Sequence, residues 1–290
     1  LMQTVNSLSG GKSSSYIAIN YPADYNVFSL VRTNDQNCIY PDKKIRQIVS
    51  DKIGKEFIGT LEDDNIIKIM LDLEQFIGSE ITWLSGKTFD EIINGSNNLG
   101  KNGSHYLPNL MARYCTTELK MNPIFDWWKR EINEVVEMRI GFRANETKRA
   151  AKMVSRLNQN GIDEMKTIIG KRKTQNKWGM VEWRIPKFPL IDDVVFKDKI
   201  EVFWNNNKEV RFGSSYFNNC VGCFHRNPIF LKKMADNHPN KMEWFAKQED
   251  LNKPNQFKKE VSYKQIIKYK SQTELSFEDF GDCDSGYCGL

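Results

Sequence analysis

A glycine pair between an apolar run and the start of a helical pattern is the feature that most constrains this chain. Ser9-Gly10-Gly11-Lys12-Ser13-Ser14 follows the run from Met2 to Leu8, which is typical of a strand, and precedes Tyr16 to Ile19, which begins a helix. Glycine lets the backbone turn tightly and come close to a ligand. The hydroxyls and free N–H groups of the first helical turn then face that ligand, and such a site favours phosphate or pyrophosphate. The sequence therefore predicts a nucleotide-binding protein with its nucleotide near the N-terminus.

This segment differs from the Walker A loop, whose pattern is G-x-x-x-x-G-K-[ST]. Gly11-Lys12-Ser13 supplies the end of that pattern, but Asn6 stands where the leading glycine belongs. The loop is also too short to wrap a triphosphate in the Walker manner. For these six residues alone, a strand-to-helix turn that binds no ligand is the simpler alternative.

Length and composition fit one α/β domain with an appendage, or two small domains, since the chain has 290 residues, 40% of them hydrophobic and 27% charged. No apolar run approaches the roughly 20 residues of a membrane span. The N-terminus enters a strand and a loop at once, where a signal peptide would have an apolar stretch. We therefore expect a cytoplasmic protein with no membrane partner. Its six cysteines are then expected to be reduced, metal-bound or reactive rather than disulfide-bonded.

Expected strands and helices alternate along the first two thirds of the chain. Further strands are expected at 26–31, 56–59, 81–84 and 135–142, and helices at 41–55, 63–76, 88–93, 122–130 and 146–159, with a loop at 94–104. Such alternation implies an α/β fold with a mostly parallel sheet, helices on both faces, and ligands at the carboxyl ends of the strands.

The pattern of expected elements changes near Phe188. A helix is expected at 193–204, followed by helix and loop rich in Lys and Cys. We divide the chain into an α/β nucleotide-binding domain, residues 1–187, and a helical, cysteine-containing extension, residues 188–290, packed on it.

A polar stretch gathers five of the chain's cations within twelve residues: Lys166, Lys171, Arg172, Lys173 and Lys177. Cations in such a group can contact a nucleic-acid backbone. The net charge of +5 is mild, however, and a solvated lysine-rich loop is the simpler interpretation and the expected one.

Two pairs of cysteines have metal-ligand spacing. Cys220-Val221-Gly222-Cys223 can place two thiolates on one ion or cluster, and Cys283 and Cys288 form a second pair in the tail. Four thiolates suit tetrahedral zinc or a [4Fe–4S] cluster, and the spacing leaves the choice open. Scattered reduced cysteines with no metal are the alternative. Cys38 has no partner in the sequence, so we expect a structural role for it.

Five segments, in this order, resemble the phosphoadenosine phosphosulfate (PAPS) reductase-like family of the PP-loop ATP pyrophosphatase superfamily. The glycine pair stands in the order S-G-G-x-x-S of the PP-loop. Arg113 to Pro123 resembles R-x-C-x-x-x-x-K-x-x-P, and Ile140 to Arg149 resembles G-x-R-x-x-E-S-x-R with Thr147 at the serine position. Phe188 to Ile191 resembles Y-P-L-I, and Cys220 to Cys223 matches the C-x-x-C of iron–sulfur members. The resemblance covers about residues 3–230.

This resemblance implies a Rossmann-like PP-loop fold that binds ATP, which Mg²⁺ can accompany, or a PAPS-type adenine nucleotide. It assigns Arg143 and Lys120 as catalytic residues that neutralise oxyanion charge. It assigns the nucleotide to Ser9, Gly10, Gly11, Lys12, Ser13, Ser14, Thr33 and Gly141. It favours a [4Fe–4S] cluster over zinc, held by Cys115, Cys220, Cys223 and Cys288. Cys283 in place of Cys288, or the four C-terminal cysteines without Cys115, are alternative ligand sets.

Two departures bear on the reaction. Iron–sulfur sulfonucleotide reductases carry adjacent cysteines where Tyr114 stands here, and they end in E-C-G-x-H, whereas this chain ends in Gly286-Tyr287-Cys288-Gly289-Leu290. The resemblance therefore favours ATP-pyrophosphatase-type activation, in which a substrate oxygen is adenylated, pyrophosphate leaves, and sulfur then displaces AMP. A nucleic-acid substrate and a sulfur-donor protein are the partners this implies. A true PAPS or APS reductase and a non-catalytic nucleotide-binding scaffold are the alternatives.

Overall fold

The computed structural model describes residues 2–173, 175–213 and 219–269. Its strands are β1 (Thr4–Leu8), β2 (Tyr25–Ser29), β3 (Arg32–Thr33), β4 (Gly59–Thr60), β5 (Thr82–Leu84), β6 (Val136–Arg139), β7 (Asp163–Arg172) and β8 (Gln175–Lys187). Its α-helices are α1 (Lys12–Asn20), α2 (Lys43–Ile53), α3 (Asn65–Ile77), α4 (Phe89–Ile93), α5 (Tyr114–Thr116), α6 (Asn122–Glu131), α7 (Thr147–Val154), α8 (Pro189–Asp192), α9 (Lys197–Asn206), α10 (Pro228–Asn237), α11 (Pro239–Leu251) and α12 (Tyr263–Lys268). Among the helices described, none has the length and apolarity needed to cross a lipid bilayer.

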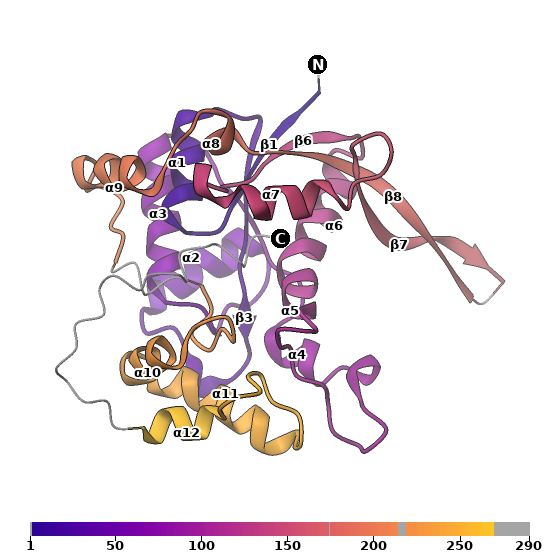
Figure 1. Ribbon diagram of the computed structural model, residues 1–290, viewed down its shortest axis with the longest axis vertical. Coiled ribbons are helices and arrows are strands. Elements are labelled where there is room, and N and C mark those ends of the chain that lie inside the picture. The colour runs from indigo at the N-terminus through magenta and orange to yellow at the C-terminus, as the bar shows by residue number, and fades with distance from the viewer. Residues whose placement is uncertain (1, 174, 214–218, 270–290) are drawn as a thin grey trace. The chain divides into compact units, whose positions relative to one another are not determined.

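Six strands form one sheet in the order β5-β2-β1-β6-β8-β7, and β3 pairs with β4 in a separate antiparallel sheet. β1 lies between β2 and β6 and runs parallel to both, and β6 runs parallel to β8. Only the pairing of β7 with β8, among those described for this sheet, is antiparallel. The expectation of an α/β fold with a mostly parallel sheet is thus confirmed (Figure 1).

The chain divides by compactness into two units, each made of three stretches of sequence. Unit 1 comprises Leu1–Phe28, Leu73–Thr82 and Ile124–Val210, and unit 2 comprises Ser29–Asp72, Trp83–Pro123 and Arg211–Leu290. The expected division at residue 187, into a nucleotide-binding domain and an extension, concerns function and stays a prediction.

Aromatic side chains build the core of unit 1. Trp128 and Trp183 are fully buried, and the ring of Phe125 contacts both. Helix α9 packs on α1, where the rings of Tyr16 and Phe203 meet edge to face with centroids 5.0 Å apart. Burying such rings contributes strongly to a core and fixes the geometry of the elements that carry them.

Unit 2 has its own buried core, in which α10, α11 and α12 contribute the C-terminal part. Phe245 of α11 lies at its centre, stacked on Tyr263 and edge to face with Phe89 and Phe257. Helix α2 begins and ends at sequence signals. Asp42 caps α2, and Gly54 ends it with a φ of 63°, a left-handed conformation that favours glycine.

The expectation of a lysine-rich loop around residues 166–177 is wrong, because this stretch forms the β7–β8 hairpin. Its turn lacks the usual Asn-Gly or Asp-Gly signal, and Lys173 adopts a φ of 58° there instead. The helix expected from residue 193 begins at Lys197, because the chain turns at Val194 with a φ of 53°.

Candidate functional site

The loop from Ser9 to Ser14 joins β1 to α1 in unit 1. Gly10 has a φ of 75°, which glycine adopts at little cost. The Ser14 hydroxyl ties the loop together, since its Oγ donates to the Gly11 carbonyl at 3.0 Å and accepts from the Ser9 N–H at 3.1 Å. Gly11 is the N-cap residue of α1 and supplies no side-chain cap. No N-cap side chain therefore competes with an anion for the N–H groups of the first turn.

A second loop follows β6, the neighbour of β1, and it touches the first. A Cβ on Gly141 would lie 3.1 Å from the Ser14 nitrogen, so the close approach of the two loops favours glycine. Arg143 follows in the same loop and is 7% exposed. Glu146 holds it, because one oxygen of that carboxylate accepts from the Arg143 N–H at 2.9 Å and from its Nε at 3.2 Å. The carboxyl ends of β1 and β6 thus bring a helix N-terminus into contact with the loop that carries a buried arginine.

Two further cations of unit 1 are held by carboxylates close to these loops. Lys12 forms an ion pair with Glu201 of α9. Arg149 pairs with the second oxygen of Glu146, and its guanidinium lies 4.2 Å from the centroid of the Phe142 ring. Glu146 therefore binds Arg143 and Arg149 at once, which fixes the orientation of both guanidinium groups.

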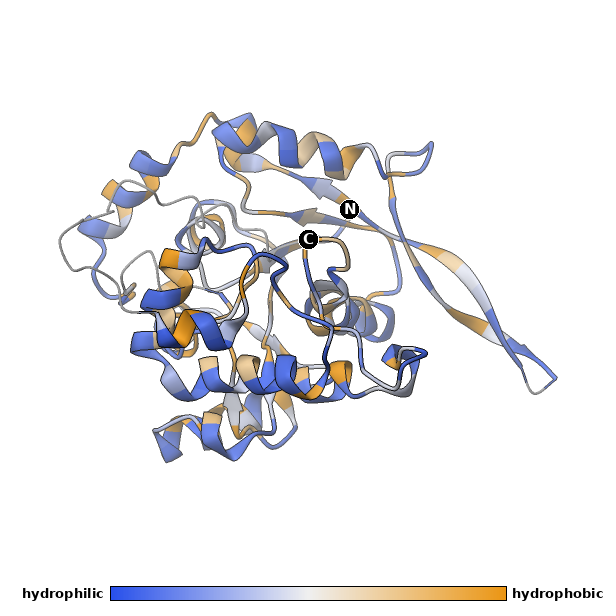
Figure 2. Ribbon diagram, turned by 60° about the horizontal axis from the view of Figure 1, so that its bottom comes forward, coloured by the Kyte–Doolittle hydropathy of each residue, from blue (hydrophilic) through white to orange (hydrophobic). Residues whose placement is uncertain are grey.

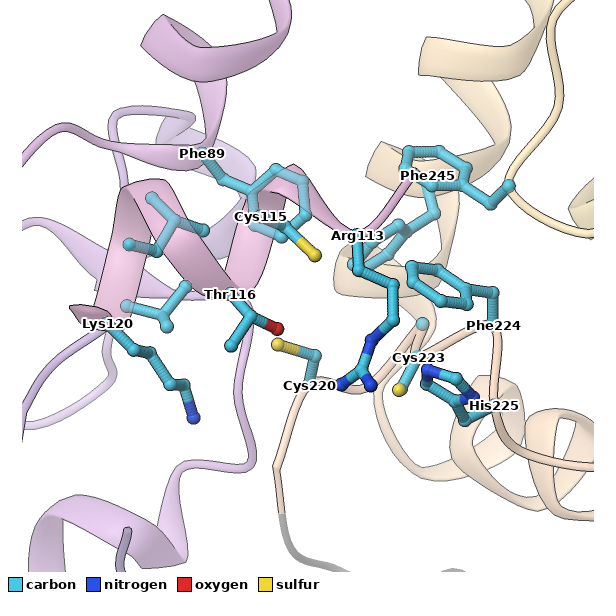
Figure 3. Close-up of a pocket in the computed structure, with 14 residues that line it drawn as sticks. Phe89, Arg113, Cys115, Thr116, Lys120, Cys220, Cys223, Phe224, His225 and Phe245 are labelled. Atoms are coloured by element: carbon cyan, nitrogen blue, oxygen red, sulfur yellow. The ribbon is translucent and has the colours of Figure 1, made fainter. Parts of the chain in front are cut away.

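In unit 2, three of the expected metal ligands line one pocket: Cys115, Cys220 and Cys223 (Figure 3). Cys115 lies in α5, and the other two lie in a turn closed by the bond from the Cys223 N–H to the Cys220 carbonyl at 3.2 Å. This turn is anchored to the segment before α3, since Val221 donates to the Leu61 carbonyl at 2.8 Å. Backbone contacts therefore set the position of the C-x-x-C turn.

The pocket combines an apolar wall with nitrogen-bearing side chains. Phe224, Phe245 and Phe257 contribute rings, whereas Arg113 and His225 contribute nitrogen atoms. Figure 3 shows the three cysteine side chains around the Arg113 side chain. The Tyr263 hydroxyl stabilises the C-x-x-C turn by donating to the Gly222 carbonyl at 2.8 Å. Burial raises the pKa of this phenol well above its usual value. The pocket thus holds soft sulfur donors and a guanidinium within one apolar wall.

Lys120 also lines this pocket, and an unusual turn of helix places it there. Residues Thr117–Met121 form a π-helical turn between α5 and α6, a feature frequent at functional sites. The Lys120 ammonium lies 2.8 Å from Oε1 of Glu62, a carboxylate that is 1% exposed. Sequence reasoning missed Glu62, for which an acidic run before a helix was the only signal.

The structure thus gathers the expected site residues into two groups. Within unit 1 it brings Ser9–Ser14 together with Gly141 and places Arg143 in the loop after β6. Within unit 2 it brings Lys120 together with the three cysteines. Cys283 and Cys288 lie outside the described residues.

Two other residues named from the sequence are enclosed in unit 2. Thr33 is 1% exposed, and its hydroxyl donates to Asp90 at 2.7 Å. Cys38 is buried, and burial raises the pKa of its thiol to about 12. Among the described residues, no two cysteines are joined by a disulfide.

Within the same described ranges, no group of three or more His, Cys, Asp or Glu side chains is arranged to hold one metal ion. In comparisons with known proteins, no protein-family model, no curated protein and no solved structure matches the chain.

Proposed function

We propose that this protein is a PP-loop enzyme of the PAPS reductase-like kind that binds an adenine nucleotide with its phosphates at the Ser9–Ser14 loop. The contact between Gly141 and Ser14 carries the proposal. It joins an uncapped helix N-terminus to the loop of a buried arginine at the carboxyl ends of two adjacent parallel strands. Ligands of open α/β sheets bind at such ends, and phosphate suits both groups.

For the reaction, we favour ATP-pyrophosphatase-type activation linked to sulfur transfer. The α1 N–H groups and Arg143 would bind the negative charge that a leaving pyrophosphate carries. Glu146 supports this role, because it fixes the Arg143 side chain before any ligand arrives. A preset guanidinium loses less entropy on binding than a mobile one.

We propose that the cysteine pocket of unit 2 holds an iron–sulfur cluster. Its donor set is soft, since Cys115, Cys220 and Cys223 share one pocket, and Arg113 and Lys120 offset the negative charge of thiolates. A zinc ion needs every sulfur within about 2.3 Å of one point, whereas each cysteine of a cluster binds a different iron. The likeness of the Cys220–Cys223 segment to the C-x-x-C of iron–sulfur members favours the cluster. The fourth ligand would come from Cys288 or Cys283, and the cluster would supply redox or sulfur chemistry.

Calorimetry with ATP tests the nucleotide site. Arg143→Gln and Ser13→Ala should each weaken ATP binding, the first roughly 10- to 150-fold if a charged hydrogen bond is lost. Arg156→Gln is the matched control, because Arg156 is an exposed cation of the same unit. Unchanged affinity in both site variants would contradict the proposal.

Product analysis separates the reactions. Release of AMP and pyrophosphate from ATP supports the activation chemistry, and thioredoxin-dependent release of sulfite from PAPS or APS would establish a reductase instead. Nucleotide binding with no turnover of any of these nucleotides would indicate the non-catalytic scaffold.

A further inference from the structure

The β7–β8 hairpin continues well beyond the strand that it pairs with in unit 1. β6 pairs with β8 from Arg184 to Lys187, whereas β7 pairs with β8 as far as Arg172 and Gln175. Figure 1 shows this distal part projecting past the rest of the sheet. The strand residues described from Ile168 to Trp178 are all exposed. A two-stranded ribbon that is solvated on both faces gains little from a core of its own, so a binding role accounts for the arm better than a packing role does.

The net positive charge of the chain is concentrated on this arm. Residues 165–181 contain five Lys and Arg and no Asp or Glu, which equals the net charge of the whole chain, +5. The remainder of the sequence is therefore balanced. Figure 2 shows the tip of the arm as strongly hydrophilic. A projecting element that holds the whole excess of positive charge complements a polyanion.

One face of the arm adds an aromatic and apolar surface between these cations. The cross-strand pairs Ile168–Trp178 and Lys166–Met180 place four side chains on the same face. Trp178 is 57% exposed, and the Lys166 ammonium lies 6.0 Å from the centroid of its ring. Lys171 shares this face on the far side of a bulge near Ile169. An exposed indole flanked by lysines can stack on an unpaired base while the lysines bind the phosphates beside it.

We propose that the β7–β8 arm binds single-stranded nucleic acid, with a base stacked on Trp178 and the backbone along Lys166 and Lys171, which share its face. The exposed indole selects unpaired bases over a duplex, whose bases are already stacked. This site lies outside the nucleotide loop and the cysteine pocket, and it does not depend on the reaction proposed above. It is an anchoring surface, and it distinguishes strands by accessibility of their bases rather than by sequence.

Fluorescence anisotropy with labelled 12-nucleotide RNA and DNA single strands tests the proposal on the full chain. Trp178→Ala should weaken binding roughly 5- to 150-fold, and Trp178→Phe should recover most of the loss, because stacking needs a ring. Affinity should fall with salt, and Lys166→Gln with Lys171→Gln should reduce the slope of log K against log salt by about 1.4. Lys43→Gln with Lys129→Gln, which removes two exposed lysines elsewhere, should leave the slope unchanged.

Three results would overturn the proposal. One is the absence of binding to either single strand at about 50 mM salt, where backbone contacts are strong. Another is equal affinity for a duplex with no effect of Trp178→Ala. The third is a dimer, seen by light scattering, that Trp178→Ala dissociates while oligonucleotides fail to bind. Arg143→Gln should not change oligonucleotide binding, so failure of the nucleotide site and failure of the arm are distinguishable.

Discussion

At the scale of single residues, the two serines at the start of α1 differ in what they already bind. The Ser14 hydroxyl is buried, donates to the Gly11 carbonyl and accepts from the Ser9 N–H, whereas Ser13 is partly exposed. We expect Ser14→Ala to lower the free energy of unfolding by about 1–2 kcal/mol, because it removes both hydrogen bonds that the buried hydroxyl makes to the loop backbone. Ser13→Ala should change stability by less than about 0.5 kcal/mol. Urea unfolding of both variants measures the difference, and equal stabilities would show that the Ser14 bonds do not organise the loop.

Glu249 makes unit 2 sensitive to pH. Its carboxylate is 4% exposed and accepts from the N–H groups of Phe257 and Tyr263, and burial raises the pKa of Glu249 from the usual 4.5 to about 7. Between these values the carboxyl is charged in the unfolded chain and protonated in the folded one, so folding takes up a proton. The associated stability is full below pH 4.5 and is lost as the pH rises through 7.

We therefore expect the titration of Glu249 to lower the free energy of unfolding by up to about 3 kcal/mol as the pH rises from 4.5 to above 7. Glu249→Gln should remove that part of the pH dependence, because glutamine does not titrate. Glu243→Gln, an exposed change in the same helix, should leave it in place. Urea titrations at several pH values measure the slope, and an unchanged slope in Glu249→Gln would refute the assignment.

At the scale of elements, the C-x-x-C turn depends on a glycine packed against α11. A Cβ on Gly222 would lie 2.4 to 2.7 Å from three atoms of the Phe245 ring, which is itself enclosed by other rings of the core. Gly222→Ala should therefore destabilise the protein by about 1–3 kcal/mol through overpacking and displace Cys220 and Cys223. Gly170→Ala is the control, since a Cβ there meets nothing within 4 Å. Gly222→Ala should have a lower thermal unfolding midpoint than Gly170→Ala. Equal midpoints would mean that the Phe245 ring can move aside without loss of stability.

The elements that the sequence predicts well are those with a local signal. Residues 4–8 and 12–20 form a strand and a helix as the apolar run and glycine pair indicate. The β7–β8 arm has no such signal, because both faces are solvated, apolar alternation is weak, and no Asn-Gly turn marks it. The ion pair between Lys120 and Glu62 could not be predicted from the sequence either, since it joins segments that only the tertiary structure brings together. Local chemistry thus predicts the loop, whereas the surroundings of the site depend on long-range packing.

At the scale of the whole molecule, each unit gathers its candidate site from separate stretches of sequence. Unit 1 joins the loop after β1 to the loop after β6, and unit 2 joins Cys115 of α5 to the C-x-x-C turn. A ligand that bridges such stretches stabilises the folded chain, because it binds the unfolded chain weakly or not at all. A metal cluster in the cysteine pocket should therefore raise the stability of the protein and also give it visible absorption.

Metal content and stability should therefore change together when a pocket cysteine is removed. Anaerobically prepared protein should contain iron and show broad absorption near ~400 nm that bleaches on reduction, because thiolate-bound clusters do. Cys220→Ala and Cys223→Ala should each lose most of the iron and lower the thermal midpoint, since each removes a sulfur from the shared pocket. Cys38→Ala should keep the full iron content, because that thiol is buried away from the pocket lining. Colourless protein with bound zinc would replace the cluster by a zinc site. Full iron content in Cys220→Ala, or neither metal in the unmodified chain, would show that these cysteines bind no metal.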